Sequence, residues 1–267
     1  MQPAGRQRRC AHRHAHPHPA AGVAHDGRAT DPAADAHADG DAPAHRDHRR
    51  ARRHAPSATP TEPPLPTEEV SGLPATPADV LITDNFDVPS LEWYAYADDA
   101  SSSGQEGGIY FVSMNVNGRW TWRLGPVNSA TKDIVIQADA RLANDDPGGV
   151  YGFICRYDSA TQSFYNFALT GDSRYRIARV NNGGDWTFLM DFGEPSPVVN
   201  PATQWNQIEV GCVSETLWLR VNGVMLASVN DAALANTGDF GFWAQTRGGA
   251  PQARAEYDFL TVRALAP

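Results

Sequence analysis

Lysine and histidine are scarce in this chain of 267 residues. Its single lysine is Lys132, and all nine histidines lie between His12 and His54. The rest of the chain therefore cannot use histidine as a general base or as a metal ligand. This excludes Ser–His–Asp and Cys–His catalysis there.

Long apolar runs are lacking as well, and cysteine is scarce. No run of about 18 apolar residues is present, so no transmembrane helix is expected. The first residues lack the apolar stretch of a signal peptide. The three cysteines, Cys10, Cys155 and Cys212, are too few for a disulfide scaffold.

Residues 1–54 contain no aromatic side chain, whereas all seven Trp, eight Tyr and ten Phe follow residue 85. Ten arginines and six aspartates give this head a net charge of +4. Because it cannot bury enough apolar surface to offset the entropy of its chain, we expect it to be disordered. Residues 55–78 follow as a semi-extended Pro/Thr/Glu linker.

Three interpretations of the head stay open. The histidine tract between His12 and His18 is typical of nickel, copper or zinc binding. The arginine run at 48–53 is typical of a nucleic-acid arm. A third interpretation comes from the codons, because a Thr-Pro repeat written in GC-rich codons reads as Ala-His-Pro-His when the reading frame is shifted. The head is then either a Thr/Pro linker read out of frame or the result of a misassigned start codon.

The body, residues 79–267, has the pattern of an all-β domain. Residues 55–267 carry 12 basic and 25 acidic side chains, a net charge of −13 that argues against nucleic-acid binding. Short β-type runs alternate with Gly, Asn and Asp clusters, and the pairs Asn117–Gly118 and Asn222–Gly223 predict hairpins. About 13 strands at this spacing predict two antiparallel sheets packed as a large jelly-roll sandwich. The expected strands are 80–86, 108–114, 119–124, 133–142, 149–157, 163–169, 174–180, 186–190, 208–213, 216–221, 224–229, 238–246 and 255–262.

The order of several segments carries a resemblance to a known family over residues 80–264. These segments are Asp-Asn-Phe-Asp at 84–87 with Trp93, 152–157, 164–167, 175–177, Trp205 and Asn206, the Leu-Trp-Leu-Arg-Val-Asn-Gly hairpin at 217–223, 238–241 and 257–259. Together they resemble concanavalin A-like and laminin G-like jelly-roll domains, in particular the 3-keto-disaccharide hydrolase group. The resemblance implies the fold, but that fold carries both lectins and glycan-cleaving enzymes.

The carboxylate pair of glycoside hydrolysis is missing from the sequence. Glucanases of this fold place Glu-x-Asp-x-x-Glu on one strand, and no such motif occurs here. We therefore favour an extracytoplasmic glycan-binding or adhesion-type module that is not an enzyme. The alternatives are a hydrolase or lyase of 3-keto-glucosides, which needs only one base and often a metal, and a structural protein-binding module.

Alternation along the central strands predicts a binding face. The resemblance places these strands side by side, so that Arg156, Asn166 and Arg176 line the concave face of one sheet, with Arg174 near them. Trp120, Trp122 and Trp243 are candidate rings for stacking on sugars. The alternative is that the tryptophans belong to the core and that the arginines are solvated or paired with acids.

A structural calcium and a disulfide are two further expectations. Lectins of this superfamily often hold calcium, and the resemblance makes Asp84, Asp145, Asp146 and Asp258 its candidate ligands. The sequence at 145–148 is equally a good turn. Cys155 and Cys212 occupy matching points of two interior strands and are either buried thiols or, outside the cytoplasm, a disulfide. No other cofactor is expected.

Overall fold

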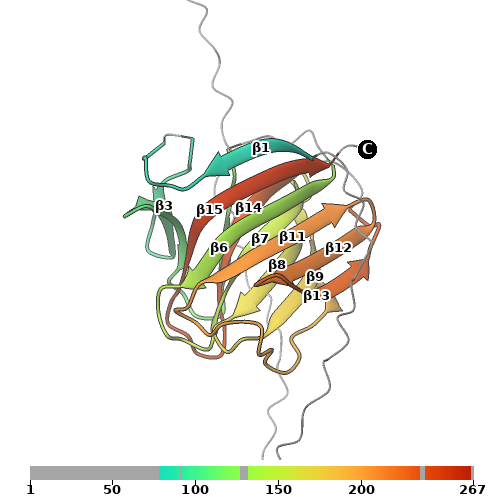
Figure 1. Cartoon of the computed structure of the whole chain (residues 1–267). Helices are drawn as coiled ribbons and strands as arrows, with labels where there is room; N and C mark the ends of the chain where they lie inside the picture. The colour runs from blue at the N-terminus through green and yellow to red at the C-terminus, as the bar shows by residue number, and fades with distance from the viewer. Residues whose placement is uncertain (1–77, 91, 127–131, 235–237, 266–267) are drawn as a thin grey trace, which may run out of the picture. The chain divides into compact units, whose positions relative to one another are not determined.

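This computed structural model describes residues 78–90, 92–126, 132–234 and 238–265. Within these ranges the chain forms fifteen strands and no helix. The all-β class is therefore confirmed. The predicted head and the linker up to residue 77 lie outside the described residues (Figure 1). Nowhere in the described ranges is there a helix long and apolar enough to cross a membrane.

The strands form two antiparallel sheets, as predicted. Their bounds are β1 Ala78–Asp84, β2 Tyr96–Ala97, β3 Ser101–Glu106, β4 Ile109–Met114, β5 Trp120–Leu124, β6 Ile134–Leu142, β7 Gly149–Asp158, β8 Ser163–Thr170, β9 Tyr175–Asn181, β10 Asp185–Met190, β11 Asn206–Val213, β12 Thr216–Val221, β13 Val224–Asn230, β14 Asp239–Thr246 and β15 Ala253–Leu265. One sheet has nine strands in the order β13-β12-β11-β6-β15-β4-β3-β2, with β1 also paired to β15. The other has six, in the order β10-β9-β8-β7-β14-β5.

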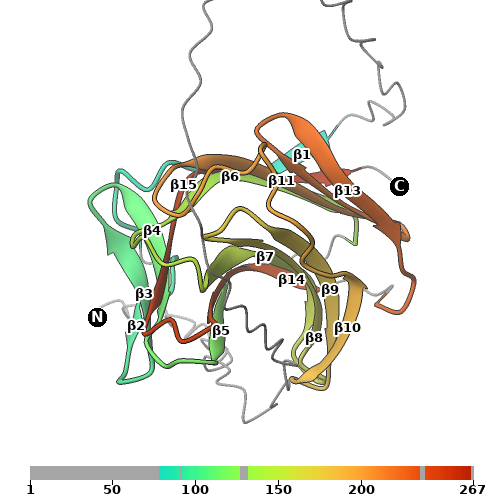
Figure 2. The same ribbon diagram turned by 90° about the horizontal axis from the view of Figure 1, so that it is seen from below.

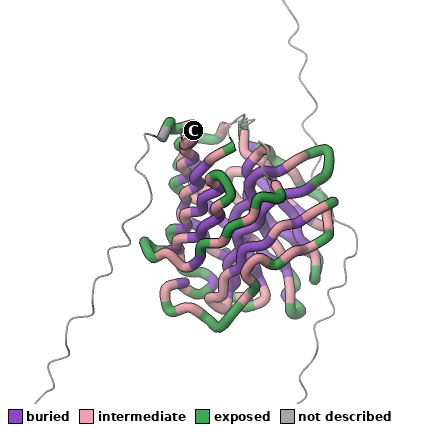
Figure 3. The backbone as a smooth tube through the Cα atoms, turned by 90° about the vertical axis from the view of Figure 1, so that its right-hand side faces the viewer, coloured by how far each residue is buried: buried purple, intermediate pink, exposed green. Residues whose placement is uncertain are grey.

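The hydrophobic core lies between these sheets. Strand β6 shows how the sequence specifies it, because Ile134, Ile136 and Ala138 point into the core as the alternation predicts. The facing strands of the six-stranded sheet contribute large aromatic side chains, among them Phe153 and Phe242. Figure 3 shows the result, with buried stretches along the strands and exposed residues at the turns. Each sheet therefore packs one of its faces against the other sheet.

One of the two predicted hairpins is correct and the other is wrong. Asn222 and Gly223 join β12 to β13 with φ of 49° and 81°, which suits a two-residue turn with both φ values positive. At Asn117–Gly118 only the glycine has a positive φ, 71°. The chain there passes from β4 in one sheet to β5 in the other, where β5 pairs with β14. An Asn-Gly pair therefore marks a turn here without marking a hairpin.

Two strands were not expected from the sequence. Strand β3 is Ser-Ser-Ser-Gly-Gln-Glu, a polar run with little β propensity, and β2 has only two residues. Pairing with the apolar strand β4 holds β3 in the sheet. Tertiary pairing therefore overrides local preference at this edge.

Candidate functional site

The six-stranded sheet carries a second apolar cluster on the side turned away from the nine-stranded sheet, which we call the outer face. Five of the six strands contribute buried members to this cluster, β10 adds a side chain at its margin, and no member comes from the nine-stranded sheet. Its members are Trp120, Trp122, Val150, Ile154, Tyr157, Phe164, Ala168, Val180 and Trp243, with Leu124, Trp186 and Phe192 packed at its margin. In Figure 2 the six strands follow an arc, so that the outer face is the concave one.

Strand register creates a row of small residues across the middle of the outer face. Arg176 is paired with Ala168, Ala168 with Gly152, and Gly152 with Trp243. Gly152 has a φ of 149°, and a Cβ there would lie 2.1 Å from the carbonyl oxygen of Phe167. Only glycine fits at this position, so no large side chain stands on the sheet between Arg176 and Trp243.

Trp243 is the centre of the aromatic cluster. Its ring is nearly parallel to that of Trp122, with centroids 6.5 Å apart, and it stacks on Trp120 at 6.1 Å. Trp186 meets it edge-on at 5.8 Å. Trp243 is fully buried, and Trp120 and Trp122 are nearly so. The rings that expose more of their area are Trp186 and Phe188 on β10, where Phe188 is 47% exposed.

Arg176 is held on this face by neutral groups. Its Nη2 donates to the amide oxygens of Asn166, at 3.3 Å, and Gln245, at 3.1 Å. The guanidinium also lies over the rings of Trp186, Phe188 and Phe192, with its carbon 4.5–5.4 Å from their centroids. Burial lowers the pKa of Arg176 to about 9, which leaves it charged at neutral pH.

Four buried donors on the outer face have no hydrogen-bond partner among the residues that the structure describes. They are Trp120 Nε1, Trp243 Nε1, Asn166 Nδ2 and Arg176 Nε. Buried polar groups are nearly always hydrogen-bonded, and leaving one unpaired costs about 1–3 kcal/mol. The outer face therefore combines aromatic rings with several N–H groups that lack an acceptor.

Five of the seven predicted binding residues thus come together, namely Trp120, Trp122, Asn166, Arg176 and Trp243. Arg156 does not join them, contrary to the expectation from alternation. A register shift after Cys155 and a φ of 52° at Arg156 turn its side chain out of the strand pattern.

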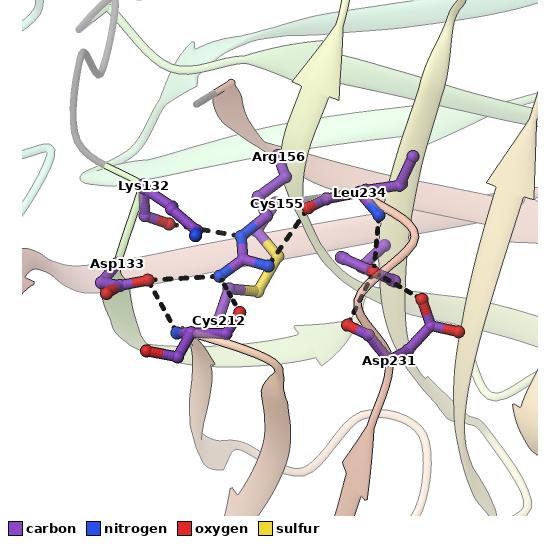
Figure 4. Close-up of a disulfide and its surroundings, with 9 residues drawn as sticks. Lys132, Asp133, Cys155, Arg156, Cys212, Asp231 and Leu234 are labelled. Atoms are coloured by element: carbon purple, nitrogen blue, oxygen red, sulfur yellow. Dashed lines mark hydrogen bonds and ion pairs between the residues drawn. A yellow bond between two sulfur atoms is a disulfide. The ribbon is translucent and has the colours of Figure 1, made fainter. Parts of the chain in front are cut away.

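Arg156 instead binds the chain at one end of the sandwich (Figure 4). Its guanidinium donates to the carbonyl oxygens of Lys132, Leu234 and Ser214 and pairs with Asp133 at 3.3 Å. These four acceptors come from three separate segments, because Lys132 and Asp133 are neighbours, and Arg156 holds the three segments together.

The structure joins Cys155 to Cys212 in a disulfide next to Arg156 (Figure 4). Cys155 lies on β7 in the six-stranded sheet and Cys212 on β11 in the nine-stranded sheet. The bond therefore crosses the core and links the sheets.

Arg174 lies in the turn between β8 and β9. It pairs with Asp172 at 2.9 Å and donates to the carbonyl oxygen of Gly193 at 2.9 Å. These bonds direct it to the loop that follows β10 and away from Asn166 and Arg176.

The four candidate calcium ligands fall into two separate places. Asp84 and Asp258 come from the neighbouring strands β1 and β15, whereas Asp145 and Asp146 lie in the loop after β6. The carboxylate of Asp84 accepts hydrogen bonds from Trp93 Nε1 at 2.6 Å and from a backbone amide at 2.7 Å. Among the described residues no group of three or more His, Cys, Asp or Glu side chains could hold a metal ion.

Several residues of the outer face were not singled out from the sequence. Trp186, Phe188 and Gln245 could have been, because they continue the alternation of strands already assigned. Phe192 and Arg247 follow the ends of β10 and β14, where no periodicity applies. Only the three-dimensional structure brings these two together, with the Arg247 guanidinium carbon 4.7 Å from the Phe192 centroid.

No protein-family model matches the chain, and neither does any curated protein. Among solved structures, the chain is similar to a protein of unknown function with a galectin-like fold from Bacillus subtilis, at 11% identity and a TM-score of 0.51 over 70% of this chain and 98% of the other. It is also similar to a Bacillus licheniformis β-glucanase, at 10% identity and 0.51 over 70% and 99%. A Clostridium perfringens endo-β-galactosidase that releases GlcNAcα1-4Gal matches at 12% identity and 0.50 over 75% and 65%. These matches confirm the concanavalin A-like jelly-roll fold, and at such identities they show the fold alone.

Proposed function

We propose that the outer face of the six-stranded sheet binds carbohydrate. The observation that carries the proposal is the set of four unpartnered N–H donors beside aromatic rings. Sugars are complementary to both features, because their C–H faces pack on aromatic rings and their hydroxyl oxygens accept hydrogen bonds from N–H donors. Trp186 and Phe188 present ring area to the ligand, while Trp120 and Trp243 supply donors from beneath.

We propose binding rather than glycoside hydrolysis. Hydrolysis by two carboxyl groups requires both to face one bond. The middle of the outer face instead holds aromatic, aliphatic, amide and guanidinium groups, represented by Trp122, Ile154, Asn166, Arg176 and Trp243. The acids that act on residues of this face belong to its margins: Asp158 and Asp239 act on Tyr157, and Asp191 acts on Arg176. Action on 3-keto-glucosides and a structural protein-binding role stay predictions from the sequence, because no feature of the described residues favours them over sugar binding.

We further propose that the module acts outside the cytoplasm. The disulfide between Cys155 and Cys212 supports this location, because disulfides are rare in reducing compartments. A Pro/Thr/Glu linker before the domain suits display at a cell envelope.

The full chain applied to a glycan array tests the proposal, and we expect it to retain at least one class of saccharide. Phe188→Ala removes a ring that is 47% exposed on the outer face, and it should weaken that binding about tenfold. Phe259→Ala is the matched control, because Phe259 is 63% exposed on β15 in the other sheet and should not affect binding. An array with no retained saccharide, or equal losses in both variants, contradicts the proposal.

A further inference from the structure

Among the described residues, Arg123 and Arg176 are both at most 5% exposed and form no ion pair with Asp or Glu, but of these two only Arg176 leaves a buried N–H without a hydrogen-bond partner. Ion pairs with Asp or Glu are formed by Arg141, Arg156, Arg174, Arg179, Arg220 and Arg254, among others. Arg176 is only 5% exposed, yet within the described residues it bonds only to amide oxygens. Residues 55–267 carry more acidic than basic side chains, so a buried guanidinium that has neither an ion pair nor a complete set of hydrogen bonds with the described residues needs an explanation.

A second arginine lies on the same ring. The guanidinium carbons of Arg176 and Arg247 are 4.5 and 4.7 Å from the centroid of Phe192, so the two charges are no further apart than these distances combined. Within the described ranges, the guanidinium of Arg247 has no hydrogen bond or ion pair of its own. Burial is the main cause that lowers the pKa of Arg176, the charge of Asp191 opposes the shift, and the charge of Arg247 adds to it.

Two like charges beside the partly buried ring of Phe192 disfavour each other and are costly to remove from water. An anion placed against them would offset both costs. Arg176 keeps a donor for such a group, because its Nε is buried and unpartnered. Guanidinium groups bind carboxylate and sulfate oxygens more strongly than hydroxyls, since the hydrogen bond is then assisted by charge.

We propose that the saccharide bound on the outer face carries an anionic substituent, a carboxylate or a sulfate, which Arg176 and Arg247 hold beside Phe192. The inference rests on the proposed function and names its ligand class. Aromatic rings and amide groups contact the neutral part of the sugar, and the two arginines select the charge.

Two pairs of polysaccharides isolate the contribution of charge. Polygalacturonate and its methyl ester differ in the carboxylate, and dextran sulfate and dextran differ in the sulfate. Calorimetric titration of the full chain at low and at physiological salt should show at least about tenfold tighter binding of the charged member of one pair, weakening as salt rises. The pair that shows the difference identifies the anion.

Arg247→Gln tests the site without disturbing the buried network around Arg176. Because this side chain is half-exposed and unbonded among the described residues, the variant should fold normally and lose about tenfold in affinity for the charged polymer. Arg220→Gln is the control, since it removes the same charge from the nine-stranded sheet. Its affinity should match that of the parent.

The outcomes separate this inference from the proposed function. Equal binding of charged and neutral polymers, or equal losses in Arg247→Gln and Arg220→Gln, overturns the inference. If neutral glycans are still retained on the array in that case, carbohydrate binding stands. If no saccharide of either kind binds, the proposed function is overturned and the inference with it.

Discussion

At the scale of single residues, Tyr257 and Gly152 determine the shape of the outer face. Tyr257 lies on β15 in the opposite sheet, and its side chain reaches across the core with no exposed area. Its hydroxyl lies 2.8 and 2.7 Å from the carbonyl oxygens of Gly152 and Trp243, and it accepts from their backbone amides at 3.2 and 3.3 Å. Hydrogen bonds from the core side thus hold the backbone of Gly152 and Trp243, which form part of the row of small residues and its neighbour on the outer face.

Tyr257→Phe should destabilise the domain by about 1–3 kcal/mol, because it leaves buried backbone groups of Gly152 and Trp243 without their partner while keeping the ring. Urea denaturation measures the change. Tyr94→Phe is the control, because Tyr94 is 37% exposed and its hydroxyl has no hydrogen bond with the described residues. Equal stabilities of Tyr257→Phe and the parent would show that the hydroxyl does not support the row.

Gly152→Ala should lower the free energy of unfolding by about 2 kcal/mol or more, since the new methyl group meets a backbone oxygen and the φ is unfavourable for alanine. Gly184→Ala is the matched control, because a Cβ there has nothing within 4 Å and should change stability by less than about 0.5 kcal/mol. Thermal unfolding of both variants checks this. A neutral Gly152→Ala would mean that the row does not require glycine.

At the scale of elements, strand alternation accounts for what the sequence could and could not predict. The period of two correctly placed Asn166 and Arg176 on one face, because β8 and β9 are regular there. It failed at Arg156, because the bulge in β7 is set by contacts with distant segments and leaves no mark in the local sequence. Alternation could not predict the positions of Phe192 and Arg247 either, because both follow the ends of their strands, where the period of two no longer applies.

The pairing of β6 with β15 places two acids directly opposite each other, Asp139 and Asp258. Burial raises the pKa of Asp139, and the charge of Asp258 raises it further. Its ionised form is therefore less favourable in the folded chain than in the unfolded one, so this residue lowers stability at neutral pH.

Asp139→Asn should accordingly stabilise the domain at neutral pH by roughly 0.2–1 kcal/mol. The gain should disappear below about pH 4, where the carboxyl is protonated in the unfolded chain as well as in the folded one. Denaturation curves across this pH range test the prediction, with Asp145→Asn in the exposed loop after β6 as the control. A gain that is the same at all pH values would exclude charge repulsion as its cause.

At the scale of the whole domain, the disulfide is the covalent link between the sheets. Cys155 and Cys212 are 57 residues apart in the sequence, and closing so long a loop restricts the unfolded chain considerably. Their strands could be assigned from the sequence, but their pairing could not, because it depends on how the two sheets face each other.

Reduction of this bond should lower the free energy of unfolding by about 2–4 kcal/mol while leaving the fold in place. Denaturation with and without a reductant measures the difference, and the double variant Cys155→Ala with Cys212→Ala should be insensitive to the reductant. An identical midpoint for the oxidised and reduced parent would contradict a disulfide that stabilises the domain.

The central claim is that the outer face of the six-stranded sheet is the place where a saccharide binds. The most direct test follows the indole N–H signals in a nitrogen–proton NMR spectrum of the full chain. Trp218 is an internal control, because its Nε1 is also buried and has no hydrogen-bond partner in the described part of the chain, but it lies on β12 of the nine-stranded sheet, between the core residues Leu217 and Leu219. On addition of the oligosaccharide best retained on the array, the signals of Trp120 and Trp243 should shift and that of Trp218 should not. A shift at Trp218 alone, or at none of the three, would contradict the claim.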